Sequence, residues 1–153
     1  MTIYAKDDLR KGRFSQVGQA YFITTVLADR EQRYLSHFEC ARIVVRNMKL
    51  LHDDKRVNSF AWVVMPDHIH WLFQLGDNAS LSSIIKLFKG RTAQLINTYL
   101  GRNGTLWQKN FYDHALRKED DLRAIARYIV ANPLRAGLVN KIGDYPHWDA
   151  IWL

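Results

Sequence analysis

His68 and His70 form a His-x-His pair inside a run of apolar and aromatic residues. Residues two apart on a strand project from the same face, so both imidazoles would reach a common point. Two nitrogen ligands leave coordination positions open, which suits a catalytic metal better than a closed structural one. Oxygen ligands added to the pair would favour Mg²⁺ or Mn²⁺, whereas imidazole alone favours later transition metals. Because most such short pairs are surface or core histidines, the hypothesis needs support from elsewhere in the chain.

Tyr128 and Asn132 stand four residues apart in a helical pattern near the C-terminus, and this spacing puts both side chains on one side of the helix. A tyrosine at the edge of a packing face is most often an amphipathic core residue. Combined with a metal-binding histidine pair, however, its phenol would permit phosphodiester transfer. In that chemistry the metal polarises a phosphate oxygen while the phenolate attacks phosphorus.

The charge balance favours a polyanionic partner. The 153-residue chain has 22 Lys and Arg against 15 Asp and Glu, a net charge of +7, which points to nucleic acid before an anionic membrane surface. The longest apolar run, 60–65, is too short to span a bilayer, so no membrane partner is expected. A charged N-terminus without an apolar signal segment, and a single cysteine, favour a cytoplasmic protein.

The elements that must position these residues are predicted in the order β-α-β-β-α-β-α. Pro66 and Asp67 mark the turn before the histidine pair, and strand alternation would point the Asp67 side chain away from it. A capping box at Ser36 and Glu39 is expected to start the first helix. Strands are predicted at 21–28, 57–65, 68–75 and 107–117, and the remaining helices begin after Ser80 and Asp120, with Leu81, Ile84, Phe88, Leu95 and Tyr99 as the apolar stripe of the long one.

This order predicts an α+β fold, a ferredoxin-like antiparallel sheet sandwiched by helices, with the C-terminal helix carrying Tyr128. We expect one domain over residues 1–153, with a basic N-terminal arm at about 1–20. Lys86, Lys89 and Arg91 on the long helix could track a nucleic-acid backbone, although they could equally form a solvated face. The aromatic residues Trp107, Phe111 and Tyr112 could stack on bases, with core packing expected for at least two of them.

Segments from three parts of the chain resemble one protein family: the histidine motif, a C-terminal signature and the basic arm. The segment WVVMPDHIHW at 62–71 resembles the His-hydrophobic-His motif of single-tyrosine transposases. The segments LWQ at 106–108, YDH at 112–114 and YIVANPLRAGLV at 128–139 resemble the C-terminal signature of REP-associated tyrosine transposases, and LRKGR at 9–13 before YFIT is similar to that subgroup. The resemblance runs from about Leu9 to Val139, and the three stretches in this order make it specific.

The resemblance implies an activity and a site. His68 and His70 would bind a divalent cation, Mg²⁺ or Mn²⁺, and Tyr128 would be the nucleophile that forms a 5′-phosphotyrosine link and releases a 3′-OH. Asn132 would be a third ligand, directly or through water, since related transposases usually have Gln there. The DNA would be a palindrome folded as a hairpin, cut by a monomer or homodimer. By analogy Arg10, Lys11 and Arg13 would grip the single strand or the hairpin base, and His114 would lie near the active site.

Two alternatives remain at this stage. A non-catalytic module for single-stranded or hairpin nucleic acid, such as a domesticated transposase, would bind without cutting. RNA-recognition folds of this kind place paired aromatics on the central strands, where this chain has His68 and His70 instead. A rolling-circle replication initiator also carries its tyrosine on a helix, but the basic arm and the segment 132–137 fit that class poorly.

Overall fold

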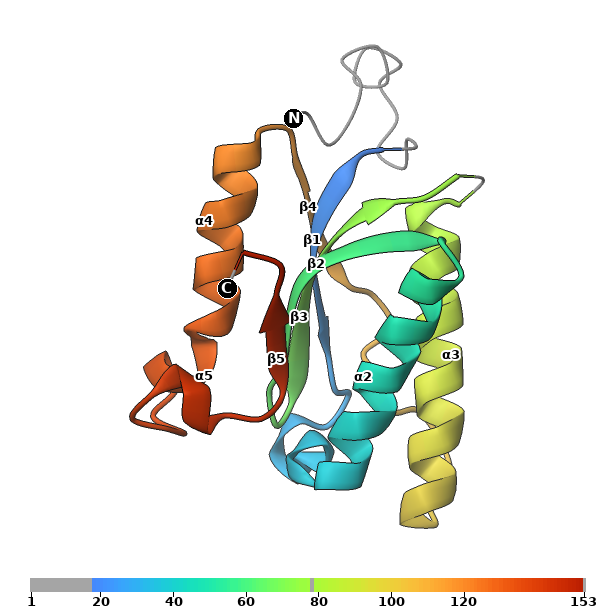
Figure 1. Ribbon diagram of the computed structural model, residues 1–153. Coiled ribbons are helices and arrows are strands. Elements are labelled where there is room, and N and C mark those ends of the chain that lie inside the picture. The colour runs from blue at the N-terminus through green and yellow to red at the C-terminus, as the bar shows by residue number, and fades with distance from the viewer. Residues whose placement is uncertain (1–17, 78, 153) are drawn as a thin grey trace.

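The computed structural model describes residues 18–77 and 79–152, so the predicted arm residues Arg10, Lys11 and Arg13 lie outside the described residues. Figure 1 shows the arrangement of the elements. In chain order they are β1 (Ala20–Val26), η1 (Arg30–Gln32), η2 (Tyr34–Ser36), α2 (Phe38–Asp53), β2 (Val57–Val64), β3 (His68–Leu75), α3 (Leu81–Leu100), β4 (Tyr112–Leu116), α4 (Glu119–Val130), α5 (Asn132–Arg135), η3 (Ile142–Asp144) and β5 (Trp148–Ala150).

The strands form one five-stranded sheet in the order β4-β1-β3-β2-β5. Every neighbouring pair is antiparallel. Its first four strands have the ferredoxin-like order, so the predicted α+β class with an antiparallel sheet is confirmed. No helix among the described residues is long and apolar enough to cross a membrane.

Helices cover both faces of the sheet, α2 and α3 on one side and α4 on the other (Figure 1). Alternation along β3 distributes its side chains between two cores. Ile69, Trp71, Phe73 and Leu75 join the core under α2 and α3. Leu72 joins the core under α4. His68 and His70 have the same phase as Leu72, so the histidine pair lies on the face that α4 covers.

Helix ends agree with the sequence at α3 and differ at α2 and α4. The Ser80 hydroxyl caps α3 by accepting from the backbone N–H of Ser83 at 3.1 Å. The predicted capping box is wrong: His37 is the N-cap of α2, and the Ser36 hydroxyl donates to the Arg33 carbonyl at 2.7 Å instead. The predicted cap at Asp120 is also wrong, because α4 begins at Glu119 with Lys118 as N-cap.

Four other elements depart from the prediction. The short strand β5 was not predicted at all, and the fourth strand is confined to β4, with Trp107 forming only an isolated bridge to Leu27. The predicted stripe of α3 is wrong at Leu95 and Tyr99, which are 48% and 55% exposed, because the buried face continues through Ile85, Thr92 and Ile96. Asn132 begins the short helix α5.

Candidate active site

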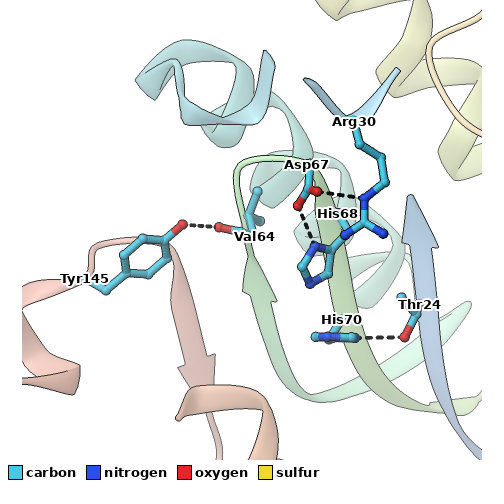
Figure 2. A network of polar contacts seen from close by, with 7 residues as sticks. All are labelled: Thr24, Arg30, Val64, Asp67, His68, His70 and Tyr145. Atoms are coloured by element: carbon cyan, nitrogen blue, oxygen red, sulfur yellow. Dashed lines mark hydrogen bonds and ion pairs between the residues drawn. The ribbon is translucent and has the colours of Figure 1, made fainter. Parts of the chain in front are cut away.

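The two central strands place a hydroxyl beside the second histidine of the pair. β1 and β3 pair so that Thr24 stands opposite His70 and Val26 opposite His68. Thr24 Oγ1 lies 2.8 Å from Nδ1 of His70. Figure 2 marks this contact with a dashed line. The His70 side chain is buried, so this hydrogen bond fixes the orientation of its ring.

A carboxylate holds the first histidine. Asp67 Oδ1 lies 2.7 Å from Nδ1 of His68, and Arg30 Nε donates to Oδ2 of Asp67 at 2.8 Å (Figure 2). The prediction that Asp67 points away from the pair is therefore wrong. Strand alternation does not apply to it, because Asp67 precedes β3 and belongs to a turn. The backbone of that turn is anchored from two sides, by Leu27 N–H on the Asp67 carbonyl at 2.9 Å and Leu35 N–H on the Pro66 carbonyl at 3.0 Å.

Both rings therefore have Nδ1 engaged within the chain, which leaves Nε2 as the nitrogen for an external ligand. The ring centroids of His68 and His70 are 4.8 Å apart. Burial, then the neighbouring His68 and Arg135, lower the pKa of His70 to about 3. At neutral pH this imidazole is uncharged, which is the form that a metal ion requires. Burial acts to raise the pKa of Asp67, but hydrogen bonds from His68 and Arg30 bring it below its ordinary value.

Helix α4 brings Tyr128 to the same place. Leu122, Ala126 and Ile129 are buried against the sheet, and Tyr128 lies at the edge of that stripe with 47% of its surface exposed. Its ring centroid is 6.0 Å from the His70 ring in an edge-on arrangement. The structure therefore unites the predicted nucleophile with the predicted histidine pair.

A cation that the sequence analysis did not single out contacts Tyr128. The guanidinium carbon of Arg135 lies 4.1 Å from the centroid of the Tyr128 ring. Arg135 Nη2 also donates to the Tyr128 carbonyl at 3.1 Å, which keeps the side chain folded back from α5 onto the end of α4. Positive charge is thus fixed over the ring of the candidate nucleophile.

Asn132 is half-buried, and its amide nitrogen is buried without a hydrogen-bond partner among the described residues. An unpaired buried amide costs free energy, so this group is suited to a partner that binds from outside the chain. Among the described residues no group of three or more His, Cys, Asp or Glu could hold a metal ion. A cation on the histidine pair would therefore need an amide, water or substrate oxygen to complete its ligands.

The predicted DNA-binding residues of α3 lie away from this site, because α3 packs on the opposite face of the sheet. The Lys89 ammonium donates to the carbonyls of Gln108 at 2.6 Å, Lys109 at 3.2 Å and Asn110 at 3.4 Å. Burial lowers its pKa. Lys86 is exposed and Arg91 half-buried. Lys89 thus holds the segment before β4. A DNA contact by Lys86, Lys89 or Arg91 stays a prediction.

The aromatic residues near β4 separate into core and surface. Trp107 is buried, and its indole N–H donates to the Thr92 hydroxyl at 2.9 Å. Phe111 packs against the core under α2 and α3. Tyr112 is 67% exposed, and the exposed His114 stands opposite Phe22 on the sheet. Core packing for two of the three predicted aromatics is confirmed.

Comparisons with protein families, curated proteins and solved structures show what this chain is similar to. Residues 18–132 match the family model described as "Transposase IS200 like". A REP-associated tyrosine transposase of Escherichia coli (strain K12) is 28% identical over 88% of this chain and 78% of its own length. A Haemophilus influenzae protein named provisionally for the same group is 31% identical over 85% of this chain and 78% of its own. A solved REP-associated tyrosine transposase bound to a REP hairpin superimposes with a TM-score of 0.71 and 26% identity, covering 89% of this chain and 79% of that one.

Proposed function

The chain belongs to the IS200-like transposase family, and from this premise we propose that it is a metal-dependent tyrosine transposase that nicks single-stranded DNA beside a palindromic hairpin. The observation that carries the proposal is the meeting of Tyr128 with His70 on one face of the sheet. A nucleophile on α4 and metal-binding nitrogens on β3 are the two parts that phosphodiester transfer by a tyrosine requires.

The donor atoms fit a divalent cation, Mg²⁺ or Mn²⁺. Nε2 of His68 and Nε2 of His70 would hold it, because Nδ1 of each ring is engaged with Asp67 or Thr24. Asn132 would be the third protein ligand through its side-chain oxygen, directly or through water. Its unpaired amide nitrogen is a hydrogen-bond donor, so it would need an acceptor such as a phosphate oxygen. When bound, the cation supplies positive charge to a nonbridging oxygen of the scissile phosphate.

Tyr128 performs the covalent step. Its phenol oxygen forms a bond to phosphorus while the bond from phosphorus to the 3′ oxygen breaks. The phenol proton passes to water, the 3′ oxygen takes up a proton, and the chain is left linked to the 5′ phosphate. Arg135 contacts the Tyr128 ring, where its charge stabilises the negative charge that develops on the attacking oxygen. The freed 3′-OH can reverse the reaction.

Hairpin DNA is the substrate that the chain's properties favour. The net charge of +7 suits a polyanion. The similar solved transposase is bound to a REP hairpin. Arg10, Lys11 and Arg13 are the proposed contacts to the single strand or the base of such a hairpin, with Lys86, Lys89 and Arg91 as further candidates.

End-labelled single-stranded palindromic DNA tests the proposal. With Mn²⁺ or Mg²⁺, a label at the 3′ end should appear in a covalent protein adduct on a denaturing gel, and a label at the 5′ end should appear in a free fragment. Chelation of the metal should abolish both products. Tyr128→Phe should bind the DNA with unchanged affinity and form no adduct.

The matched control is Tyr99→Phe, which removes the same hydroxyl from an exposed tyrosine of α3 on the opposite side of the sheet and should leave the adduct unchanged. If the wild-type chain binds the hairpin but forms no adduct with either metal, the nicking proposal is wrong. The protein would then be a hairpin-binding module.

A further inference from the structure

Part of the catalytic face of the sheet lies beyond the main contacts of α4. The helix packs mainly on β2, β3 and β5. Beside it, on β1 and β4, lie Phe22, Tyr112 and His114, which we call the β1–β4 platform. Phe22 is half-buried and the other two are exposed. The platform borders the candidate active site directly, because the Phe22 ring is centred 5.3 Å from the His70 ring and 6.1 Å from the Tyr128 ring.

Strand register fixes where Tyr112 stands relative to the site. Tyr112 is opposite Thr24 on β1, and Thr24 is opposite His70 on β3. Directly opposite residues of an antiparallel sheet project from the same face, so the Tyr112 ring shares the face of His70. The same phase places Leu116 of β4 in the core under α4. Two strand spacings separate Tyr112 from His70, a distance of roughly 10 Å.

Tyr112 differs from the other aromatic residues of its segment. Trp107 and Phe111 pack in or against the core under α2 and α3, on the other face. Tyr112 is 67% exposed. A single exposed ring needs no explanation by itself. This one, however, is separated from a metal-binding histidine by one residue across the sheet, on a surface continuous with the nucleophile.

We propose that Tyr112 is a stacking surface for an unpaired nucleobase next to the scissile phosphate. The proposal rests on the function proposed above. Every base has an aromatic face, so such a contact adds affinity for single-stranded DNA without selecting its sequence. Tyr112 is therefore a positioning residue: it holds the strand in line with Tyr128 and takes no part in bond making.

Fluorescence from a purine analogue that is quenched by stacking tests this contact. The analogue is placed in turn at each unpaired position flanking a palindromic DNA hairpin, and binding is measured in the Tyr128→Phe background so that the DNA stays uncut. One flanking position should be quenched on binding. Tyr112→Phe should keep the quenching, and Tyr112→Ala should lose it and bind the DNA roughly tenfold more weakly or worse.

Tyr99→Ala is the matched control, since it removes another exposed tyrosine from α3 on the opposite face and should change neither readout. A hairpin without flanking single strands should bind equally to the Tyr128→Phe protein with and without the Tyr112→Ala substitution. If Tyr112→Ala keeps both quenching and affinity, or weakens the bare hairpin equally, the stacking proposal is wrong whether or not an adduct forms. If quenching depends on Tyr112 while the wild-type chain never forms an adduct, stacking is supported and the nicking proposal alone fails.

Discussion

Each of the two histidines places its Nδ1 within hydrogen-bond distance of a side chain, and the two partner side chains differ in charge. His70 meets the neutral hydroxyl of Thr24, whereas His68 meets the carboxylate of Asp67, which Arg30 holds from its other oxygen. A carboxylate on the far nitrogen fixes the tautomer of an imidazole and makes it a stronger metal ligand. If the proposed cation binds the histidine pair, Asp67 would act on it through His68, as a positioning residue.

Asp67→Asn should weaken divalent-metal binding by about 10- to 100-fold, the usual effect of losing such a partner. The amide oxygen can still accept a hydrogen bond from His68, while the charge and the exposed hydrogen bond from Arg30 are lost. The fold should persist, because an exposed ion pair contributes little to stability. Isothermal titration with Mn²⁺ measures the affinity. Asp77→Asn is the control, because Asp77 is an exposed carboxylate beyond the other end of β3. Equal Mn²⁺ affinity in Asp67→Asn and the wild-type chain would contradict this role for Asp67.

At the scale of elements, α4 holds Tyr128 through a narrow apolar stripe. Ile129 is fully buried beside the exposed Tyr128. Ile129→Ala should lower the free energy of unfolding by about 2–5 kcal/mol, because it leaves a cavity between helix and sheet. Leu95→Ala in α3, where the side chain is 48% exposed, should change it by less than about 0.5 kcal/mol. Urea unfolding measures both, and equal effects would contradict the burial pattern of the two helices.

The sequence predicts the elements of this fold best where the pattern is long. β3 has the predicted bounds, because apolar residues stand at every second position from Ile69 to Leu75 and turns lie at both ends. β5 has three residues, too few to show a period, and it exists because it pairs with β2. The α3 stripe was misplaced because a slightly different helical phase also connects apolar residues, and only packing on the sheet selects Ile96 over Leu95 and Tyr99.

Some residues of the candidate site could be predicted from local sequence patterns, and others could not. The histidine spacing, the tyrosine and the tyrosine-to-asparagine interval are local patterns and could be found in the sequence. Thr24 could not, because 46 residues separate it from His70 and only the β1–β3 register joins them. Arg135 needed the turn from α4 into α5 to fold it back on Tyr128. Asp67 was correctly predicted to lie in the turn before His68, but the direction of its side chain was taken from strand alternation, which does not extend into a turn.

Across the whole molecule, the sheet separates the main hydrophobic core from the chemistry. The core under α2 and α3 contains the aromatic cluster of Trp71, Phe73 and Phe88. The other face has a smaller core under α4 and, beside it, titratable groups that are wholly or partly buried. Residues proposed to bind metal or DNA can therefore be substituted on the α4 face while the larger core under α2 and α3 remains intact.

Buried and half-buried titratable groups make the stability of the metal-free protein sensitive to acid. Burial, His68 and Arg135 lower the pKa of His70 from 6.5 to about 3, and burial and then Arg42 lower that of His147. The pKa of Asp67 is also lowered, by the hydrogen bonds that overcome its burial. Each of these groups binds a proton more readily in the unfolded chain. Their contribution to the free energy of unfolding is therefore fully present above the pKa of the group in the unfolded chain. It is lost as the pH falls toward the pKa of the group in the folded protein.

With a chelator present, the free energy of unfolding in urea should fall as the pH is lowered from about 7 toward 3. Within that window a single group of this kind contributes a slope of about 1.4 kcal/mol per pH unit. His70→Asn removes one titration and should flatten the slope between pH 6.5 and about 3. Identical slopes in the wild-type chain and His70→Asn would show that folding does not lower the pKa of His70. The conclusion that His70 is held in the uncharged form that a metal requires would then be wrong.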